Sequence, residues 1–294
     1  MIRSFCPVLG LALGLALGLA LALALGLASA ATAQDAAKVI TLGGSVTEIA
    51  VALGAGDRII ARDTTSTWPD SVQVLPDVGY IRALSPENVL ALDPGLIIAE
   101  GDAGPPQAVE VLQAAGIPFV LVPEATDPSG ILAKITAVAK ALDLEAEGRV
   151  LGAAVQGRLD AALARAAAVS APMRVLFVLS LQGGGVLAGG EGTEADAIIR
   201  LAGAVNAATG FAGYKPMTDE AILAAAPDAI LMMDRAGDLA VADADVRAHP
   251  ALGQTPAARA AMIIRMDGML LLGFGPRTPE AADRLYDALY GSEG

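Results

Sequence analysis

Two short segments of this chain combine a phenol with a nearby cation. One is Gly79-Tyr80-Ile81-Arg82 and the other is Gly213-Tyr214-Lys215. A phenol ionises at about pH 10 in water, and a guanidinium within hydrogen-bond reach favours the ionised form. A phenolate is a hard anionic ligand that suits ferric iron. Tyr80 is therefore a candidate metal ligand, and the plainer interpretation is a half-buried loop tyrosine.

The chain offers few competing ligands. It has one cysteine, Cys6, in the N-terminal segment, and one histidine, His249, in an Ala-His-Pro turn sequence. Thiolate zinc sites, iron–sulfur clusters and multi-histidine metal cages are therefore excluded. No Asp/Glu cluster is spaced like a metal-binding loop, and no Gly-x-Ser-x-Gly motif occurs. The lack of these residues weakens the case for most classes of enzyme. Tyrosinate, a known axial ligand of haem, is nearly the only strong iron ligand that the chain can still offer.

The N-terminal segment predicts export. Arg3 precedes a run of Leu, Ala and Gly from Val8 to Leu27, and Ala31-Thr32-Ala33 follows. A basic start, an apolar run and a small-x-small triplet are typical of a secretory signal peptide, which we assign to residues 1–33. A permanent membrane anchor is the alternative, because the run is long enough to span a bilayer. The absence of a charged flank after the run favours the signal peptide.

The charge balance argues against nucleic acid as a partner. The 294 residues include 32 acidic and 19 basic side chains, and the formal net charge is −13. Such a protein repels phosphate backbones.

Short apolar runs alternate with helical patterns from residue 38 onward, which predicts parallel β-α units and an α/β fold. Expected strands are 38–42, 59–61, 96–99, 119–122, 174–179, 229–233 and 263–266, and expected helices are 46–53, 107–115, 129–142, 193–201 and 280–289. The stretch 144–169 lacks Pro and follows Asp143, a good N-cap, so we expect one helix of about 25 residues there. The predicted domains are an N-terminal lobe (34–142), a linking helix (143–170) and a C-terminal lobe (171–294).

The two predicted lobes resemble each other in sequence. Each contains a Gly-Tyr pair, then a short capped helix, then a Pro and an apolar strand, and both Glu87/Glu220 and Pro94/Pro227 lie 133 residues apart. Two equivalent α/β lobes joined by a long helix leave a cleft, which is a usual place for a ligand. Glu87 and Glu220 occupy matched positions at the starts of their helices. They either complement the helix dipole or form a pair of anions that dock on a basic partner.

Three weaker candidates complete the set. Trp68, the only tryptophan, either stacks on a flat ligand or anchors its loop. Arg277 could meet a carboxylate. Gly183-Gly184-Gly185 could cradle an anion, although a glycine run after a strand is usually a turn. The methionines have no ligand spacing and are assigned to packing.

The sequence resembles the periplasmic haem-binding proteins of bacterial haem-uptake ABC importers, the HmuT type, over residues 38–290. The similarity is carried by Asp63-Thr64-Thr65-Ser66-Thr67-Trp68-Pro69, Leu75-Pro76-Asp77-Val78-Gly79-Tyr80-Ile81-Arg82-Ala83-Leu84-Ser85, Gly213-Tyr214-Lys215-Pro216-Met217-Thr218 and Leu272-Gly273-Phe274-Gly275-Pro276-Arg277-Thr278. The Gly-Tyr-x-Arg segment is the most specific part, and the rest is shared with cobalamin- and ferric-siderophore-binding proteins.

The resemblance implies a class III periplasmic binding protein, with two Rossmann-like lobes joined by one rigid helix and haem in the cleft. It implies Tyr80 as the iron ligand, Arg82 as the group that keeps Tyr80 ionised, and Glu87 and Glu220 as docking anions for Arg residues of the permease. Some relatives add a His from the second lobe. This chain has no His between Gly183 and Thr193, so Tyr214 is the only aromatic ring expected to face the ligand from that side.

The expected protein is then a monomeric periplasmic carrier rather than an enzyme. It would capture haem, including haem delivered through an outer-membrane receptor, and pass it to the permease and ATPase of an inner-membrane ABC transporter. Arg82 and Lys215 would offset the repulsion between an acidic protein and the haem propionates. Two rivals stay open: the same fold carrying cobalamin or a ferric siderophore, and a chelatase-like periplasmic enzyme.

Overall fold

The computed structural model describes residues 38–234 and 240–291. The predicted signal peptide, residues 1–33, lies outside these ranges. None of the helices in the described ranges is both long enough and apolar enough to cross a bilayer.

The N-terminal lobe is built on a parallel sheet of four strands in the order β2-β1-β3-β4. The strands are β1 Val39–Leu42, β2 Ile59–Arg62, β3 Leu96–Glu100 and β4 Phe119–Val122. Their helices are α2 Gly44–Ala52, α3 Pro86–Leu90, α4 Pro106–Ala114 and α5 Pro128–Ala141. β1 and most of β3 are buried, as the apolar sequence of central parallel strands requires. The carboxyl ends of these strands carry the polar residues described below.

The C-terminal lobe is built on a mixed sheet in the order β10-β9-β5-β6-β8, with β7 paired to β5. Its strands are β5 Arg174–Gln182, β6 Gly185–Gly189, β7 Val205–Asn206, β8 Tyr214–Met217, β9 Ala229–Asp234 and β10 Ile263–Asp267. Its helices are α7 Glu194–Leu201, α8 Asp219–Ala225, α9 Asp243–Ala248, α10 Pro256–Arg259, α11 Gly268–Leu272 and α12 Thr278–Tyr290. β10, β9 and β5 run parallel, whereas β6 is antiparallel to both β5 and β8.

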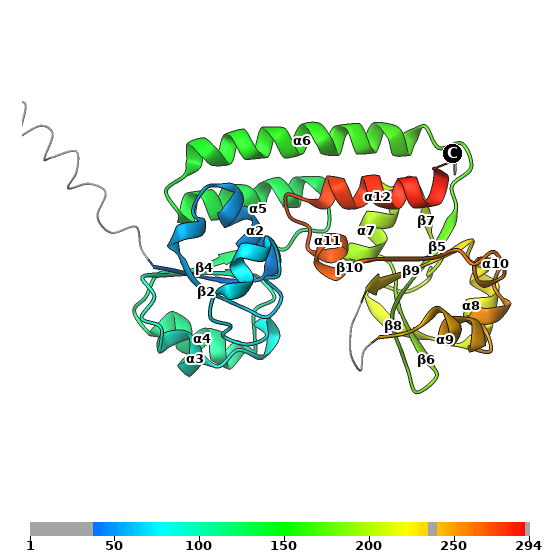
Figure 1. Ribbon diagram of the computed structural model, residues 1–294, viewed down its shortest axis with the longest axis horizontal. Helices are drawn as coiled ribbons and strands as arrows, with labels where there is room; N and C mark the ends of the chain where they lie inside the picture. Colours follow the sequence, from blue (N-terminus) through cyan, green and yellow to red (C-terminus); the bar gives the residue numbers. More distant parts are fainter. Residues whose placement is uncertain (1–37, 235–239, 292–294) are drawn as a thin grey trace, which may run out of the picture. The chain divides into compact units, whose positions relative to one another are not determined.

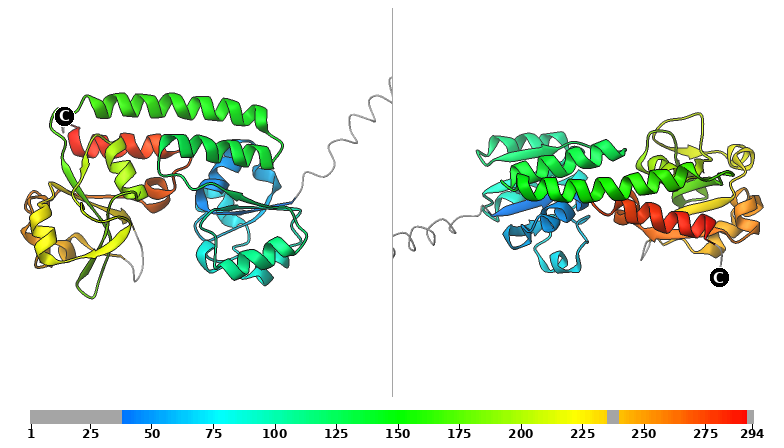
Figure 2. Two further views of the ribbon diagram at one scale, coloured as in Figure 1. Left: turned by 180° about the vertical axis from the view of Figure 1, so that it is seen from behind. Right: turned by 90° about the horizontal axis from the view of Figure 1, so that it is seen from above.

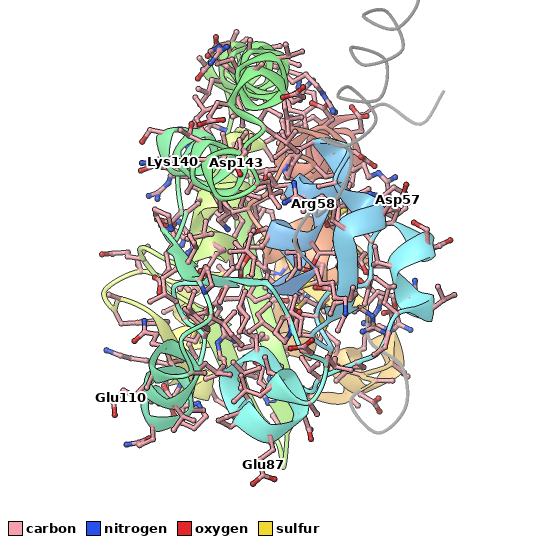
Figure 3. The ribbon with its side chains drawn as sticks, turned by 90° about the vertical axis from the view of Figure 1, so that its left-hand side faces the viewer. Asp57, Arg58, Glu87, Glu110, Lys140 and Asp143 are labelled. Carbon is pink, nitrogen blue, oxygen red and sulfur yellow. The ribbon has the colours of Figure 1, made fainter. Side chains whose placement is uncertain are left out.

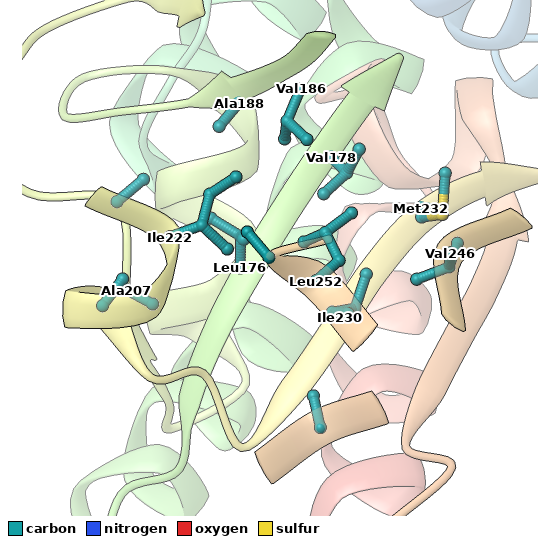
Figure 4. Close-up of a cluster of buried hydrophobic side chains, with 14 residues drawn as sticks. Leu176, Val178, Val186, Ala188, Ala207, Ile222, Ile230, Met232, Val246 and Leu252 are labelled. Atoms are coloured by element: carbon teal, nitrogen blue, oxygen red, sulfur yellow. The ribbon is translucent and has the colours of Figure 1, made fainter. Parts of the chain in front are cut away.

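Side chains from the parallel strands β5 and β9 and from the antiparallel strand β6 pack into one apolar core. Leu176 and Val178 of β5, Ile230 of β9 and Val186 of β6 lie in a single buried cluster, together with Ile222 of α8 (Figure 4). Each of these side chains is at most 1 % exposed. This burial fixes the register of β6 and hence the position of β8, which follows it at the sheet edge.

A single long helix, α6 Glu145–Ala167, runs alongside α5 of the first lobe and α12 of the second (Figures 1 and 2). Its 23 residues correspond to about 35 Å at 1.5 Å per residue. A Cβ on Gly148 would stand 2.4 Å from the Cβ of Ala139, so glycine permits the close approach to α5. At the other end, Arg165 pairs with Asp283 of α12 and its guanidinium covers the Tyr286 ring.

The prediction that Asp143 caps this helix is wrong. Asp143 has φ = 58°, and its backbone N–H donates to Lys140 O, so Asp143 closes α5 in the left-handed conformation. Leu144 is the N-cap of α6, and no side chain caps that end.

The other expected strands and helices are confirmed to within three residues at each end, and the largest difference is at β5, which runs to Gln182 rather than to residue 179. The structure adds β6 and β8, where the sequence analysis expected only a glycine loop and a Gly-Tyr segment. Short helices α9, α10 and α11 and 3₁₀ turns at Gly56–Arg58, Asp70–Val74, Ile81–Ala83 and Leu252–Gln254 complete the described chain. The lobe boundaries at residues 142, 143 and 170 stay predictions.

Candidate functional site

Tyr80 lies between β2 and α3, and it is exposed while Val78 and Ile81 on either side of it are buried. Gly79 precedes it with φ = 104°, a conformation that glycine adopts without strain. Tyr80 itself is the N-cap of the 3₁₀ turn Ile81–Ala83, and its carbonyl accepts a hydrogen bond from Ala83 N–H at 2.8 Å. Its side chain is well exposed, at 42 %. The phenol is therefore reachable by a ligand, while the backbone beneath it is fixed.

Arg82 joins Tyr80 to a carboxylate. Its Nη1 donates to the Tyr80 hydroxyl oxygen at 2.9 Å, while Nε donates to Oδ2 of Asp102 at 2.8 Å and Nη2 donates to the same oxygen. Partial burial on its own lowers the pKa of Arg82, but Asp102 and then Tyr80 outweigh it and raise that pKa above its usual value. The guanidinium is thus held as a cation against the phenol. The sequence analysis identified Tyr80 and Arg82 and missed Asp102, whose place just after β3 was its one available signal.

Trp68 and Arg277 form a second group with Glu48. The Arg277 guanidinium carbon lies 4.5 Å from the centroid of the Trp68 ring, and the indole is 46 % exposed. Nε of Arg277 donates to Glu48 at 3.0 Å and Nη2 donates to its other oxygen. The expected carboxylate partner of Arg277 is therefore a residue of this chain, on α2. Burial raises the pKa of Glu48 more than the contact with Arg277 lowers it.

A buried lysine, Lys134, lies close to the carboxyl end of β3. Lys134 of α5, with its side chain 4 % exposed, donates to Ser45 Oγ at 2.8 Å and to the Gly273 carbonyl at 3.3 Å. It also lies 3.5 Å from a carboxylate oxygen of Glu100, at the end of β3. Gly273 follows α11, so this ammonium group ties the two lobes together. Sequence analysis did not single out Lys134, because nothing local marks it as buried.

The second Gly-Tyr segment differs from the first. Tyr214 opens β8, its hydroxyl donates to Glu194 at 3.1 Å, and its ring meets Phe177 edge-on at 6.3 Å between centroids. Burial, and after it the Glu194 carboxylate, raises the pKa of Tyr214. Lys215 is exposed. In the described chain, no hydrogen bond, ion pair or ring contact joins Tyr80 to Tyr214 or Lys215.

Glu87 and Glu220 occupy equivalent positions in the two lobes. Each lies in the first turn of a short helix whose N-cap side chain, Ser85 or Thr218, accepts a backbone N–H. Both carboxylates are exposed, and Glu87 projects outward from α3 (Figure 3). Hydrogen bonds from its own backbone N–H and from Thr218 lower the pKa of Glu220. The internal repeat in the sequence therefore places one exposed carboxylate at the same position in each lobe.

The glycine run and the histidine form one structural contact. Gly183 and Gly184 adopt positive φ between β5 and β6, as a turn. His249 is buried, its Nε2 lies 3.0 Å from the Gly184 carbonyl oxygen, and its Nδ1 accepts two backbone N–H groups. We therefore find a turn rather than an anion cradle at this position.

Two further observations bear on ligands. The described residues contain no group of three or more His, Cys, Asp or Glu side chains placed to hold a metal ion. A cavity of about 560 Å³ lies between the end of α2 and the start of α6, lined by residues such as Leu53 and Val150. It shares no residue with the Tyr80 or Trp68 groups, so its position does not identify their ligand.

Three comparisons relate the sequence and the fold of this chain to known proteins. Residues 39–270 match the model of the family described as periplasmic binding protein. The solved periplasmic haem-binding protein BhuT, in complex with two haems, is 42 % identical, with a TM-score of 0.83 over 87 % of this chain and 98 % of that one.

Two curated proteins add sequence similarity. The uncharacterised ABC transporter substrate-binding lipoprotein YvrC of Bacillus subtilis (strain 168) is 27 % identical over 86 % of this chain and 80 % of its own length. A vitamin B12-binding protein of Yersinia pestis (strain Pestoides F) is 39 % identical over 87 residues, which cover 30 % of this chain and 31 % of that protein.

Proposed function

This chain belongs to the periplasmic binding protein family, and on that premise we propose that it captures ferric haem outside the cytoplasm and delivers it to an ABC transporter. One observation carries the proposal: the exposed Tyr80 phenol accepts a hydrogen bond from the Arg82 guanidinium at 2.9 Å. A phenol paired with a fixed cation is suited to bind ferric iron as tyrosinate. The similarity to BhuT supports haem as the cargo.

Each candidate residue has a distinct role in this proposal. Tyr80 supplies the axial oxygen, and Arg82 stabilises its negative charge. Trp68 offers an aromatic face to the porphyrin, with Arg277 holding the indole from one side. Lys215 is the cation for a propionate.

Tyr214 contributes a ring contact rather than a second iron ligand. Its hydroxyl already donates to Glu194, and its raised pKa opposes ionisation. The proposal therefore has one protein ligand to iron.

Charge makes the capture dependent on salt. The chain carries a formal net charge of −13, and haem propionates are also anionic. Only local cations such as Arg82 and Lys215 favour the encounter. Screening weakens both the general repulsion and these local attractions, so we expect the association rate to change with ionic strength.

The proposed function is binding and transfer, without chemical conversion of the cargo. The signal peptide of residues 1–33 would be removed on export, and the mature protein would act in the periplasm as a monomer, taking haem that an outer-membrane receptor has admitted. Glu87 and Glu220 would then dock on the permease, which works with its ATPase. A mixture of haem and protein that released free iron and porphyrin would instead favour the chelatase-like enzyme.

A second cargo keeps specific support. The 87-residue match to a vitamin B12-binding protein favours cobalamin, another large planar macrocycle, on the same fold. With cobalamin or a ferric siderophore, Tyr80 and Trp68 would serve as contact surfaces. Parallel titrations with haem, cobalamin and a ferric siderophore separate these cargoes.

The decisive experiment is an absorption titration of the exported protein with ferric haem. We expect a tyrosinate-type ferric spectrum and quenching of the fluorescence of Trp68, the only tryptophan. Tyr80→Phe should abolish the tyrosinate band and weaken binding. The matched control is Tyr286→Phe on α12, whose ring packs against Arg165 and Tyr290. An unchanged spectrum and affinity in Tyr80→Phe would refute the assignment of the ligand.

A further inference from the structure

We infer that Asp102 is a positioning residue for haem capture: its carboxylate fixes the Arg82 guanidinium so that Nη1 stays directed at the Tyr80 phenol. This inference rests on the proposed function. It concerns Asp102, a residue that the sequence analysis did not select.

The arrangement of donors determines the orientation. Both Nε and Nη2 of Arg82 donate to one oxygen of Asp102, and the remaining Nη1 donates to Tyr80. A guanidinium is planar and rigid, so fixing one edge of it also fixes the direction of the third nitrogen. The carboxylate therefore sets the angle at which Nη1 meets the phenol oxygen.

Arg82 needs such an anchor because its side chain is 61 % exposed. An exposed arginine has many rotamers, and holding it in one of them costs conformational entropy. The Asp102 side chain is 26 % exposed and sits on a loop that has its own backbone constraints. The ordering cost is thus met in the free protein, before a ligand arrives.

Backbone hydrogen bonds hold the two loops in register. Gly104 N–H donates to the Ile81 carbonyl at 2.9 Å, and Leu84 N–H donates to the Gly104 carbonyl at 2.8 Å. Ala103 N–H closes the turn after β3 by donating to Glu100 O at 3.0 Å. Gly104 is thus bonded to Ile81 and to Leu84, which precede and follow Arg82 in the sequence. These two bonds hold the Cα atoms of Arg82 and Asp102 at a fixed separation.

Charge and position act in opposite directions at this residue. A carboxylate beside Arg82 offsets part of the positive charge that favours a tyrosinate, so Asp102 brings no benefit through charge alone. Its other oxygen, Oδ1, is buried and has no hydrogen-bond partner among the described residues. The benefit must then come from geometry, which an amide at the same place can reproduce.

The test is a double-mutant cycle with Arg82. Asp102→Ala should raise the rate of haem transfer to excess apomyoglobin about tenfold, the factor expected when a hydrogen bond to an anion is lost. Asp102→Asn keeps an acceptor oxygen, and we expect its rate to stay within about threefold of wild type. In the Arg82→Ala background, Asp102→Ala should have no further effect, because nothing is left to position.

Measurements on the ligand-free protein make the test independent of haem. The Arg82 Nε–H resonance, identified by its loss in Arg82→Ala, should exchange slowly with solvent in wild type and Asp102→Asn and rapidly in Asp102→Ala. If Asp102→Ala does not fold, Asp102→Glu replaces it: the longer side chain should displace the guanidinium and speed transfer, while Asn does not.

The outcomes distinguish failure of the positioning role of Asp102 from failure of haem binding. Equal effects of Asp102→Ala with and without Arg82, or a wild-type transfer rate in Asp102→Ala, would overturn the positioning role while haem binding stands. Failure of wild type to bind haem would overturn the proposed function, and the Nε–H exchange would still decide whether Asp102 anchors Arg82.

Discussion

Arg277 and Glu48 form a buried ion pair although 229 residues separate them in the sequence. Glu48 comes from α2 of the N-terminal lobe, and Arg277 precedes α12 of the C-terminal lobe. Their side chains are 7 % and 17 % exposed, and the same guanidinium covers Trp68. Arg277 therefore links the lobes and supports the indole that we propose as a haem contact.

Removing the arginine should destabilise the protein. Arg277→Ala leaves the Glu48 carboxylate buried without its cation, a change that costs about 3 kcal/mol in comparable buried pairs. Urea unfolding followed by far-ultraviolet circular dichroism measures the loss. The control is Arg284→Ala, which breaks the exposed pair of Arg284 with Glu280 and should cost less than about 1 kcal/mol. Equal losses in the two variants would show that burial does not govern the Arg277 contact.

Glu100 should make stability depend on pH. Burial raises its pKa above 4.5, although Lys134 and Ser45 act in the opposite direction. The folded protein then holds this proton more tightly than the unfolded chain, so the stabilisation is complete below pH 4.5 and is lost as pH rises through the folded pKa. Glu100→Gln does not titrate.

The free energy of unfolding of Glu100→Gln minus that of wild type should therefore grow as pH rises from 4.5. Urea unfolding of both proteins at a series of pH values up to neutrality measures this difference. A difference that shrinks as pH rises would contradict the assigned direction.

Tyr214 should be the late-ionising tyrosine. Burial and the neighbouring Glu194 raise its pKa above 10, so the folded state holds the phenolic proton more tightly and loses that stabilisation as pH rises through the raised value. An alkaline titration of tyrosinate absorbance should show a late component that is missing from Tyr214→Phe.

The same variant, Tyr214→Phe, tests which of the two tyrosines, Tyr80 or Tyr214, binds the haem iron. Tyr214→Phe should keep the tyrosinate–haem spectrum, because Tyr80 supplies the oxygen in our proposal. Loss of that spectrum in Tyr214→Phe, with Tyr80 intact, would move the ligand to the second lobe.

Glu87 and Glu220 should act in delivery and not in capture. Glu87→Lys and Glu220→Lys reverse exposed charges, so haem binding should stay at the wild-type level while transport by the cognate importer in vesicles falls, most in the double variant. Glu110→Lys, which reverses an exposed charge on α4 of the same lobe as Glu87, is the matched control (Figure 3). Equal transport by the double variant and the control would exclude these two residues from docking.

The sequence by itself determined the features that depend on near neighbours. Apolar runs predicted the central strands, and α7 begins where its sequence predicts, with the Thr193 side chain as its N-cap. Tyr80 and Arg82 are two residues apart, so a single turn is enough to bring phenol and guanidinium together. Local geometry and side-chain type decide such contacts, and both can be read directly from the chain.

Only the tertiary structure decided which distant groups meet. Asp102 faces Arg82, Glu48 faces Arg277, and Glu194 engages Tyr214, although no local pattern pairs them. The two Gly-Tyr segments look alike in sequence, yet one is an exposed turn and the other a strand held against β6. The physical reason is that burial of apolar surface drives collapse of the chain but is non-directional, so it does not select which residues meet. Packing and polar satisfaction in the folded core then select them.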